Sequence, residues 1–356
     1  MSQPEGEASE RIDLARAMPS PAYGAKDIRI VGAGPAGAAA AIAALSESAG
    51  VRISERSRSA RHKVCGEFIS PEACQVLDDL GVWANFLRLQ PARIRRCVLH
   101  FGPRVKQWAL SEPGYGLSRL ELDRLLLERA RALGATVARG ESLAHEANAA
   151  GAALILACGR QSAPARQGRL FGFKAHFAGP ADDAVELFFT PSGYIGVSAV
   201  ESNLTNVCGI AREDMLRHYE FRIDEFVMRA GPVAERLRPL SRQMPWLTVG
   251  PLRYSGIDNT HGDPHIYPAG DALGFVDPFT GSGILNALIT GRMAGLFAAR
   301  QIASESYVTA CRSLLHRPFV VSSIFRAVLR WECVSHLAAI VPGNWIYRLT
   351  RPSFHA

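Results

Sequence analysis

The sequence lacks the cysteine patterns of metal sites and disulfide frameworks. Its seven cysteines form no CxxC pair, and no histidine stands near them at the spacing of a metal-binding motif. We therefore expect no metal. Free cysteines also suit the reducing conditions of the cytoplasm, where we expect the protein to work.

Long apolar runs and an apolar leader are also missing. No stretch approaches the roughly 20 apolar residues that a membrane-spanning helix needs. The first 20 residues contain acidic side chains and no apolar core, which argues against a signal or transit peptide. Any membrane contact is therefore expected to be peripheral, and residues 1–25 are expected to form a flexible lead.

The composition has no extreme that would indicate a disordered or fibrous protein. Apolar residues make up 48% and charged residues 21% of 356 residues, which is enough chain for one large domain or two joined domains. The 40 basic residues exceed the 33 acidic ones and leave a scattered charge of +7. This surplus does not indicate nucleic acid. It suits a phosphate-bearing cofactor, an acidic carrier protein or an anionic membrane face.

A nucleotide-binding motif begins at the first predicted strand. The β-branched stretch 28–31 leads into a glycine-rich turn and a small-residue helix at 38–45, which is the GxGxxG pattern in its proper context. Gly32 permits the tight turn, Gly34 lets the backbone approach a pyrophosphate, and Gly37 lets the helix pack on the strand. The predicted cofactor contacts in this turn are Gly32, Gly34, Pro35, Ala36 and Gly37.

The second predicted strand, at 51–54, ends at Glu55. This position suits a carboxylate that accepts hydrogen bonds from the ribose hydroxyls of a dinucleotide. An acid here disfavours a 2′-phosphate, so the motif predicts FAD or NAD rather than NADP at this site. Arg56, the next residue, is expected near the adenine or in solvent.

Three further segments carry a resemblance to a known family. They are RHKVCGEFISP at 61–71, LSRLELD at 117–123 and GDALGFVDPFTGSGI at 270–284. Together they resemble the geranylgeranyl reductase family of FAD-dependent oxidoreductases, within the para-hydroxybenzoate hydroxylase-like flavoprotein monooxygenases. The resemblance covers roughly residues 28–300 and implies FAD as the cofactor.

The Gly-Asp segment also has a physical interpretation. Asp271 follows a short predicted strand at 265–268, so its carboxylate emerges at a strand end and can accept a hydrogen bond from a ribityl hydroxyl. Gly270 leaves room for the backbone. A glycine-rich turn then opens a helix at 284–289, and the resemblance places this turn beside the flavin ring. The predicted cofactor contacts here are Gly270, Asp271, Gly281, Ser282, Gly283 and Ile284.

The resemblance implies further contacts with the flavin. It places Cys65 and Gly66 close to the isoalloxazine ring, and Arg119, at the start of a predicted helix, near the flavin. Gly159 belongs to a strand-turn in which Cys158 stands where relatives often have Asp or Thr. We therefore expect the cofactor to contact Cys65, Gly66, Arg119 and Gly159, and we expect Cys65 to take part in catalysis.

Short predicted strands dominate the sequence after residue 169. They lie at 172–177, 184–189, 194–200 and 206–211, with Gly, Pro and Asp between them, as in an antiparallel sheet. The resemblance implies that this sheet covers the flavin and forms the substrate pocket. Candidates for proton transfer are the ionisable residues Glu67, Lys174, His176 and Tyr194, of which His176 and Tyr194 are predicted to be catalytic.

These elements predict an α/β fold with an α+β substrate part. A lead (1–25) precedes a discontinuous Rossmann-like FAD-binding domain (26–165 and 250–305), which encloses an antiparallel-sheet substrate domain (166–249). A helical segment (306–356) follows. Its apolar and aromatic faces suit packing against the cofactor domain, with a peripheral membrane patch or a wall around a lipophilic substrate as alternatives.

The sequence favours a flavin monooxygenase that hydroxylates a lipophilic small molecule. The alternative is a reductase that saturates carbon–carbon double bonds of a prenyl or polyketide chain. A halogenase is a lesser alternative because the WxWxIP signature is absent from the sequence. A non-catalytic nucleotide-binding protein is opposed by the intact Gly-Asp turn.

The electron donor is not encoded by a second nucleotide motif. The sequence contains only one GxGxxG, so a dedicated nicotinamide domain is not expected. NADPH or NADH would then bind transiently, or a separate reductase would deliver the electrons. The identity of the substrate and the oligomeric state stay open at this point.

Overall fold

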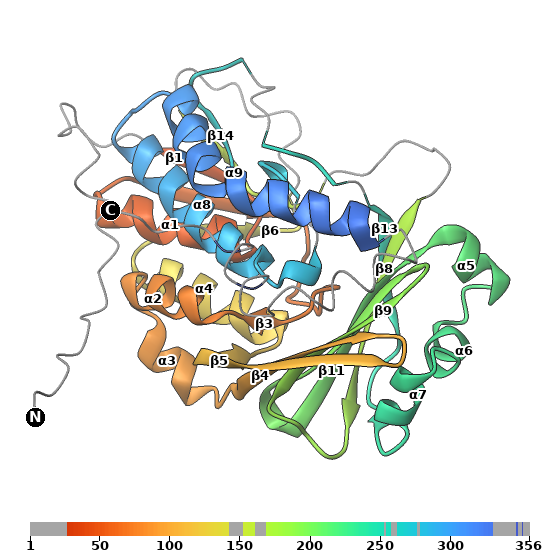
Figure 1. Ribbon diagram of the computed structural model, residues 1–356. Helices are drawn as coiled ribbons and strands as arrows, with labels where there is room; N and C mark the ends of the chain where they lie inside the picture. The colour runs from red at the N-terminus through yellow and green to blue at the C-terminus, as the bar shows by residue number, and fades with distance from the viewer. Residues whose placement is uncertain are drawn as a thin grey trace, which may run out of the picture.

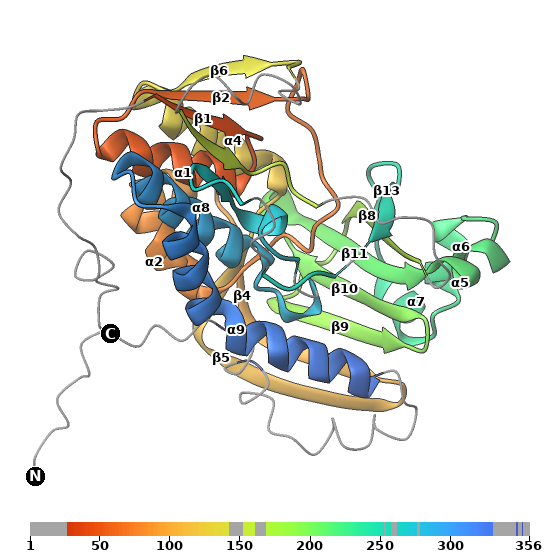
Figure 2. The ribbon, with the colours of Figure 1, turned by 90° about the horizontal axis from the view of Figure 1, so that it is seen from above.

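The computed structural model describes most of the chain between residues 27 and 351. The described residues are 27–141, 152–160, 169–252, 254–257, 262–275, 278–329, 347 and 351. The predicted lead and the helices predicted beyond residue 329 lie outside them. Two sheets dominate the described part and stand side by side (Figure 1, Figure 2).

The first sheet is parallel and carries the predicted nucleotide-binding motif. Its five described strands stand in the order β14-β7-β1-β2-β6, and every neighbouring pair is parallel. The strands are β1 (Ile28–Val31), β2 (Val51–Glu55), β6 (Thr136–Arg139), β7 (Ala153–Leu156) and β14 (Ile266–Pro268). Parallel strands bring their carboxyl ends to one edge, so the loops after β1, β2, β7 and β14 meet there.

Helices α1 (Pro35–Ser46) and α8 (Gly283–Ala299) pack against this sheet, and α9 (Ser304–Leu329) contacts α8 and β14. Further out, α4 (Arg119–Ala132) packs on α1, α2 (Pro71–Asp79) packs on α8, and α3 (Trp83–Arg88) contacts α2 and α4. α8 lies close against α1. A Cβ at Gly291 would stand only 2.1 Å from the carbonyl oxygen of Ala36, so this approach requires glycine. α8 extends well beyond the predicted 284–289, since small apolar residues continue to its end. No helix in the described ranges combines the length and apolar character needed to cross a membrane.

The second sheet has nine described strands from separate parts of the chain. Their order is β12-β8-β11-β10-β9-β4-β5-β3, and β13 also pairs with β8. The strands are β3 (Phe68–Ile69), β4 (Ala92–Phe101), β5 (Arg104–Gly116), β8 (Leu170–Ala178), β9 (Ala184–Thr190), β10 (Gly193–Ala199), β11 (Leu204–Arg212), β12 (Ser241–Arg242) and β13 (Leu247–Leu252). The four strands predicted after residue 169 are thereby confirmed as β8 to β11.

The second sheet differs from the prediction in two ways. β4 and β9 run parallel, so the sheet is mixed rather than antiparallel throughout. β3, β4 and β5, within 68–116, belong to this sheet although the predicted boundaries placed them in the FAD-binding domain. The β4–β5 hairpin escaped prediction because polar and charged residues alternate along both strands and obscure their apolar face.

β8 has two chemically different faces. Phe173 and Phe177 pack into an apolar core with the short helices on that side. These helices are α5 (Glu213–His218), α6 (Ile223–Met228) and α7 (Pro232–Leu237), which lie at the end of the sheet away from the first sheet (Figure 1). Lys174 and His176 alternate with the phenylalanines and therefore point to the opposite face. There they meet Glu67, in the segment that leads into β3.

Candidate active site

A cavity of about 630 Å³ is lined by residues of both sheets. This volume is within the range of cofactor and small-molecule sites. One part of its lining, here the nucleotide wall, follows the parallel strands and includes Gly32, Gly34, Glu55, Gly159 and Asp271. Most predicted site residues line the cavity: Gly32, Gly34, Pro35, Ala36, Glu55, Arg56, Cys65, Gly66, Arg119, Gly159, Tyr194, Gly270, Asp271, Gly281, Gly283 and Ile284.

Three predicted site residues are not part of the described lining. A Cβ at Gly37 would stand 1.9 Å from the carbonyl oxygen of Gly32, so this glycine serves the packing of α1 on the turn. Ser282 is buried, and its hydroxyl lies 2.8 Å from that of Thr280. His176 is buried behind Glu67. The structure thus gives these residues supporting positions rather than the predicted direct contacts.

The turn after β1 is shaped to admit a phosphate. Gly32 has φ +103°, and a Cβ there would stand 2.3 Å from the carbonyl oxygen of Ala157, so only glycine fits. Above Gly34 the space is open. The nearest groups to a Cβ at Gly34 are the guanidinium of Arg119 at 3.5 Å and the ammonium of Lys63 at 3.9 Å. A phosphate at Gly34 would meet bare backbone, the α1 N-terminus and two cations.

One carboxylate holds both of these cations in place. Asp123 accepts a hydrogen bond from Arg119 Nε at 2.8 Å and another from Lys63 Nζ at 2.8 Å. Burial would lower the pKa of Arg119, but the charge of Asp123 raises it above its ordinary value, so the guanidinium stays charged. Two cations against one carboxylate leave positive charge beside Gly34, which suits a pyrophosphate. Sequence reasoning identified Arg119 and missed Lys63, because a single lysine carries little specificity.

Glu55 stands at the end of β2 as predicted. Its carboxylate accepts hydrogen bonds from the backbone N–H groups of Ala33, at 3.0 Å, and Ser57, at 2.9 Å. Burial would raise the pKa of Glu55, but these bonds and the nearby Lys63 lower it, so the group is an anion at neutral pH. A carboxylate has about four acceptor sites, which leaves capacity for two ribose hydroxyls.

Asp271 faces the cavity from the turn after β14. Its Oδ2 lies 3.6 Å from Arg160 Nε, and Arg160 also stands over the ring of Phe275 at 5.0 Å. Burial raises the pKa of Asp271, and the cations Arg160 and Arg119 oppose this only in part. Gly270 adopts φ +61° and brings the backbone close to α1. The open backbone at Gly34 with Arg119 and Lys63 therefore fits the pyrophosphate of FAD. Glu55 fits the ribose, and Asp271 fits the ribityl group.

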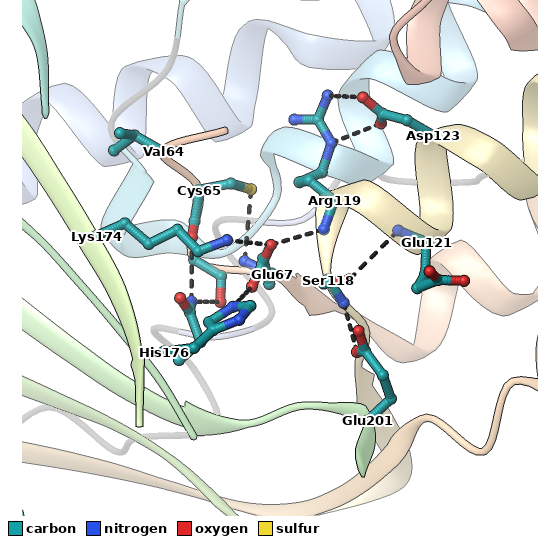
Figure 3. A network of polar contacts seen from close by, with 12 residues as sticks. Val64, Cys65, Glu67, Ser118, Arg119, Glu121, Asp123, Lys174, His176 and Glu201 are labelled. Carbon is teal, nitrogen blue, oxygen red and sulfur yellow. Dashed lines mark hydrogen bonds and ion pairs between the residues drawn. The ribbon is translucent and has the colours of Figure 1, made fainter. Parts of the chain in front are cut away.

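The segment before β3 forms the part of the lining between the two sheets. Asn206 of β11 donates hydrogen bonds to the carbonyl oxygens of Cys65, at 3.1 Å, and Gly66, at 2.9 Å. The Cys65 thiol is free and accepts a hydrogen bond from the Glu67 N–H at 3.4 Å. The second sheet thus fixes the backbone that presents Cys65 to the cavity (Figure 3).

Glu67, Lys174 and His176 form a buried group that we call the inner cluster. Glu67 Oε1 accepts hydrogen bonds from the Lys174 ammonium and from the Arg119 N–H at 2.6 Å, while Oε2 lies 2.7 Å from His176 Nε2. Figure 3 shows Glu67 between Lys174 and His176 on one side and Arg119 on the other. Burial would raise the pKa of Glu67, but His176 and Lys174 outweigh burial and lower it. The cluster is therefore an ionised pair with a histidine attached.

The backbone of Glu67 supports a functional interpretation of this cluster. Glu67 has φ +57°, a left-handed conformation that costs energy for a residue with a side chain. Such conformations persist where surrounding contacts impose them. Here Lys174, His176 and the Arg119 N–H all bond to the Glu67 carboxylate and hold the residue in this conformation. His62, in the same segment, adds an imidazole that meets His176 edge-on at 5.1 Å between ring centroids.

His62, Glu67 and His176 are also the described residues that could hold a metal ion. Their donor atoms lie within 4.8 Å of one another. However, the Lys174 ammonium already bonds to Glu67 and would repel a metal cation. The geometry favours an ion-paired cluster over a metal centre.

Another part of the lining, here the sheet wall, comes from the second sheet and is mostly apolar. We define it by Leu99 of β4, Trp108 of β5, and Val185, Leu187 and Phe189 of β9. Tyr194 adjoins it, with its ring 6.0 Å from that of Phe189. Arg351 also lines the cavity and donates a hydrogen bond to the Thr280 carbonyl at 2.6 Å. Sequence reasoning missed Leu99 and Trp108 together with the β4–β5 hairpin.

The chain is similar to known flavoproteins along most of its length. A family model described as FAD binding domain matches residues 25–163. Digeranylgeranylglycerophospholipid reductase 1 from Methanopyrus kandleri is 30% identical over 359 aligned positions, covering 89% of this chain and 90% of the relative. The chain belongs to the geranylgeranyl reductase family of FAD-dependent oxidoreductases. FAD and the oxidoreductase class, expected from the resemblance, are thereby confirmed for this family member.

Solved structures share the fold of this family member. A triple mutant of the flavin-dependent brominase Bmp2 matches with a TM-score of 0.76 at 15% identity, covering 93% of this chain and 95% of that chain. A geranylgeranyl bacteriochlorophyll reductase-like protein from Thermoplasma acidophilum matches with a TM-score of 0.67 at 20% identity, covering 92% and 94%. At such identities the likeness concerns the fold alone, and it confirms the predicted α/β class.

Proposed function

We propose that this family member is an FAD-dependent reductase that saturates carbon–carbon double bonds of a prenyl chain in a lipophilic molecule. The observation that carries the proposal is the 30% identity to a digeranylgeranylglycerophospholipid reductase along 90% of that relative. The sequence alone favoured a monooxygenase and kept the reductase as its alternative. The similarity to the relative now favours the alternative, and hydroxylation stays an untested prediction.

The sheet wall supports a lipophilic substrate. Five apolar side chains of β4, β5 and β9 line the cavity. A prenyl chain laid on this wall would exchange water for hydrocarbon contact, at about 25 cal/mol for each Å² buried. The segment with Cys65 and Gly66 separates the two walls, and we place the reacting double bond beside it.

The residues of the nucleotide wall would hold the cofactor by the groups already described. When bound, FAD supplies the hydride for the reduction. Arg119 and Lys63 neutralise the pyrophosphate, Glu55 accepts from the ribose hydroxyls, and Asp271 accepts from a ribityl hydroxyl. The α8 N-terminus, behind the turn at Gly281, places positive dipole charge at the end of the cavity.

The electron supply and the surroundings of the enzyme are part of the same proposal. NADPH or NADH reduces the flavin during a transient visit, or a separate reductase does so. The substrate reaches the protein from a membrane surface or a carrier protein, on the cytoplasmic side. The scattered positive charge of +7 supports an anionic delivery surface.

Product analysis tests the proposed function. The purified holoenzyme is reduced with dithionite and given a polyprenyl lipid, once without oxygen and once in air. We expect the lipid to gain hydrogen atoms in pairs without oxygen present. A product that carries an added oxygen atom and forms only in air would support the monooxygenase and overturn the reductase. Gly34→Val, which fills the phosphate cradle, serves as the control that retains no flavin.

A further inference from the structure

His62 connects the cavity to the inner cluster. Its imidazole is part of the cavity lining, next to the segment with Cys65. Its Nδ1 atom is buried and has no hydrogen-bond partner among the described residues. The ring meets His176 edge-on at 5.1 Å, and the donor atoms of His62, His176 and Glu67 lie within 4.8 Å of one another. A histidine that lines the cavity can transfer a proton to a ligand bound there.

The charges around His62 come from three elements. Lys174 and His176 face it from β8, Glu67 from its own segment, and Glu201 from the turn after β10. Burial lowers the pKa of His62 most, and Lys174 and His176 lower it further, while Glu67 and Glu201 act in the opposite direction. The imidazolium of His62 is therefore a stronger acid than an ordinary histidine.

Saturation of a double bond requires such an acid. The reaction adds a hydride to one carbon and a proton to the other, so that the electron pair of the double bond forms the new C–H bond with the proton. Reduced FAD provides the hydride, which leaves the proton to the protein. An ordinary imidazolium is a stronger acid than an ordinary thiol by about two pKa units, and His62 is the histidine found in the described lining.

We propose that His62 is the catalytic acid that protonates the substrate double bond, and that the inner cluster holds its imidazole in place. This proposal rests on the proposed reductase function. After the proton transfer, the neutral imidazole regains a proton from water entering the cavity. Lys174 and His176 act as positioning residues, because they belong to the inner cluster and are not part of the described cavity lining.

The first test is the saturation reaction of a His62→Gln holoenzyme. We expect the rate of saturation to fall on the order of a hundredfold, as for loss of a general acid. FAD content and flavin reduction by dithionite should stay unchanged. The rate of the wild-type enzyme should rise as the pH falls through the pKa of His62, and this rise should be missing in the variant.

His100→Gln is the matched control. His100 lies 3.2 Å from the buried Glu186, as His176 lies beside Glu67, but His100 is not part of the described lining. It should saturate the lipid at the wild-type rate. Saturation that survives His62→Gln with an unchanged pH profile overturns the role of His62, as does loss of saturation in Cys65→Ser with normal turnover in His62→Gln. A wild-type enzyme that never saturates the lipid overturns the proposed function itself.

A second measurement needs no flavin and no turnover. Histidine NMR signals of the apoprotein are followed against pH, and the His62 signal is assigned by its absence in His62→Gln. We expect it to titrate below the ordinary range. Lys174→Gln should raise the titration midpoint, whereas Glu201→Gln, which leaves the Glu67–Lys174 pair intact, should lower it. A His62 midpoint that neither substitution moves would contradict the coupling to the inner cluster.

Discussion

Two clusters in the second sheet share the same chemistry and differ in their surroundings. Each combines one glutamate, one histidine and one basic residue: Glu67, His176 and Lys174 in the inner cluster, and Glu186, His100 and Arg236 in what we call the outer cluster. Side chains of the inner cluster are at most 4% exposed, whereas those of the outer cluster are 10% to 20% exposed.

The outer cluster joins three structural elements and is not part of the described cavity lining. Glu186 of β9 bonds to His100 of β4 and to Arg236 of α7, and the His100 ring stacks on Phe188 at 4.0 Å. The inner cluster instead bonds to the backbone of Arg119 and adjoins His62 at the cavity. Two similar sets of side chains thus differ in position: one joins strands and a helix, and the other lies beside the cavity lining.

The largest predicted difference between the clusters is in stability. Glu67→Gln leaves the Lys174 ammonium buried without its counter-ion, which costs about 3–5 kcal/mol. Glu186→Gln leaves a partly exposed Arg236 that water can solvate, so we expect a loss of about 1 kcal/mol. Urea unfolding of the two apoproteins measures both. Equal losses would remove the distinction between a dry and a partly solvated cluster.

Glu55 extends the comparison to a carboxylate with spare acceptor sites. Its described hydrogen bonds come from backbone N–H groups, so Glu55→Lys should leave the fold intact, unlike Glu67→Gln. The variant loses charge-assisted bonds to the ribose worth about 1.5–3 kcal/mol, or roughly ten- to a hundredfold in flavin affinity. Flavin content after purification checks this, with Glu128→Lys on the exposed face of α4 as control. Full occupancy in Glu55→Lys would refute the ribose role.

Asp271 should behave like Glu55 and unlike the inner cluster. Asp271→Ala leaves a ribityl hydroxyl unpaired and should weaken flavin binding by about 1–3 kcal/mol, while added FAD restores part of the activity. Titration of the apoprotein with flavin gives the affinity, and a thermal melt without flavin reports the fold. Asp78→Ala, exposed on α2, is the control. A collapsed melt would make Asp271 a structural residue of the same kind as Glu67.

The two clusters should also differ, by a smaller amount, in the stability that they lose at low pH. The pKa of Glu67 lies below its ordinary value of 4.5, since His176 and Lys174 outweigh burial, and His100 and Arg236 likewise lower that of Glu186. Each carboxylate therefore stabilises the fold above the unfolded pKa, and the stability is lost as the pH falls through the folded pKa. Unfolding measured from neutral pH into this acid range should show a flatter acid limb in Glu67→Gln than in Glu186→Gln. A flatter acid limb in Glu186→Gln than in Glu67→Gln would contradict the larger contribution expected of Glu67.

Local patterns made the nucleotide wall predictable. The β1–α1–β2 unit, Glu55 at the strand end and the Gly-Asp turn are written in contiguous residues, and each has a steric or hydrogen-bonding cause. The same holds for the alternating strands β8 to β11. These elements follow from short stretches of sequence because their signals repeat within a few residues.

The inner cluster and the sheet wall have no such local signature. Glu67 meets Lys174 and His176 across 107 and 109 residues, so the ion pair exists only after β8 docks against the segment before β3. The parallel pairing of β4 with β9, which adds Leu99 to the cavity, likewise depends on distant strands. Lys174 and His176 could be named as ionisable candidates from the sequence, but their common partner could not.

Anaerobic reoxidation of the flavin tests the central claim, reduction of a prenyl double bond, most directly. The holoenzyme is reduced with dithionite, freed of excess reductant and mixed with a polyprenyl lipid in the absence of oxygen, while the flavin absorbance is recorded. We predict that the oxidised absorbance returns at a rate that depends on the lipid concentration, and that a saturated lipid of the same length has no effect. A flavin that stays reduced with the lipid and reoxidises only when oxygen is admitted would contradict the account.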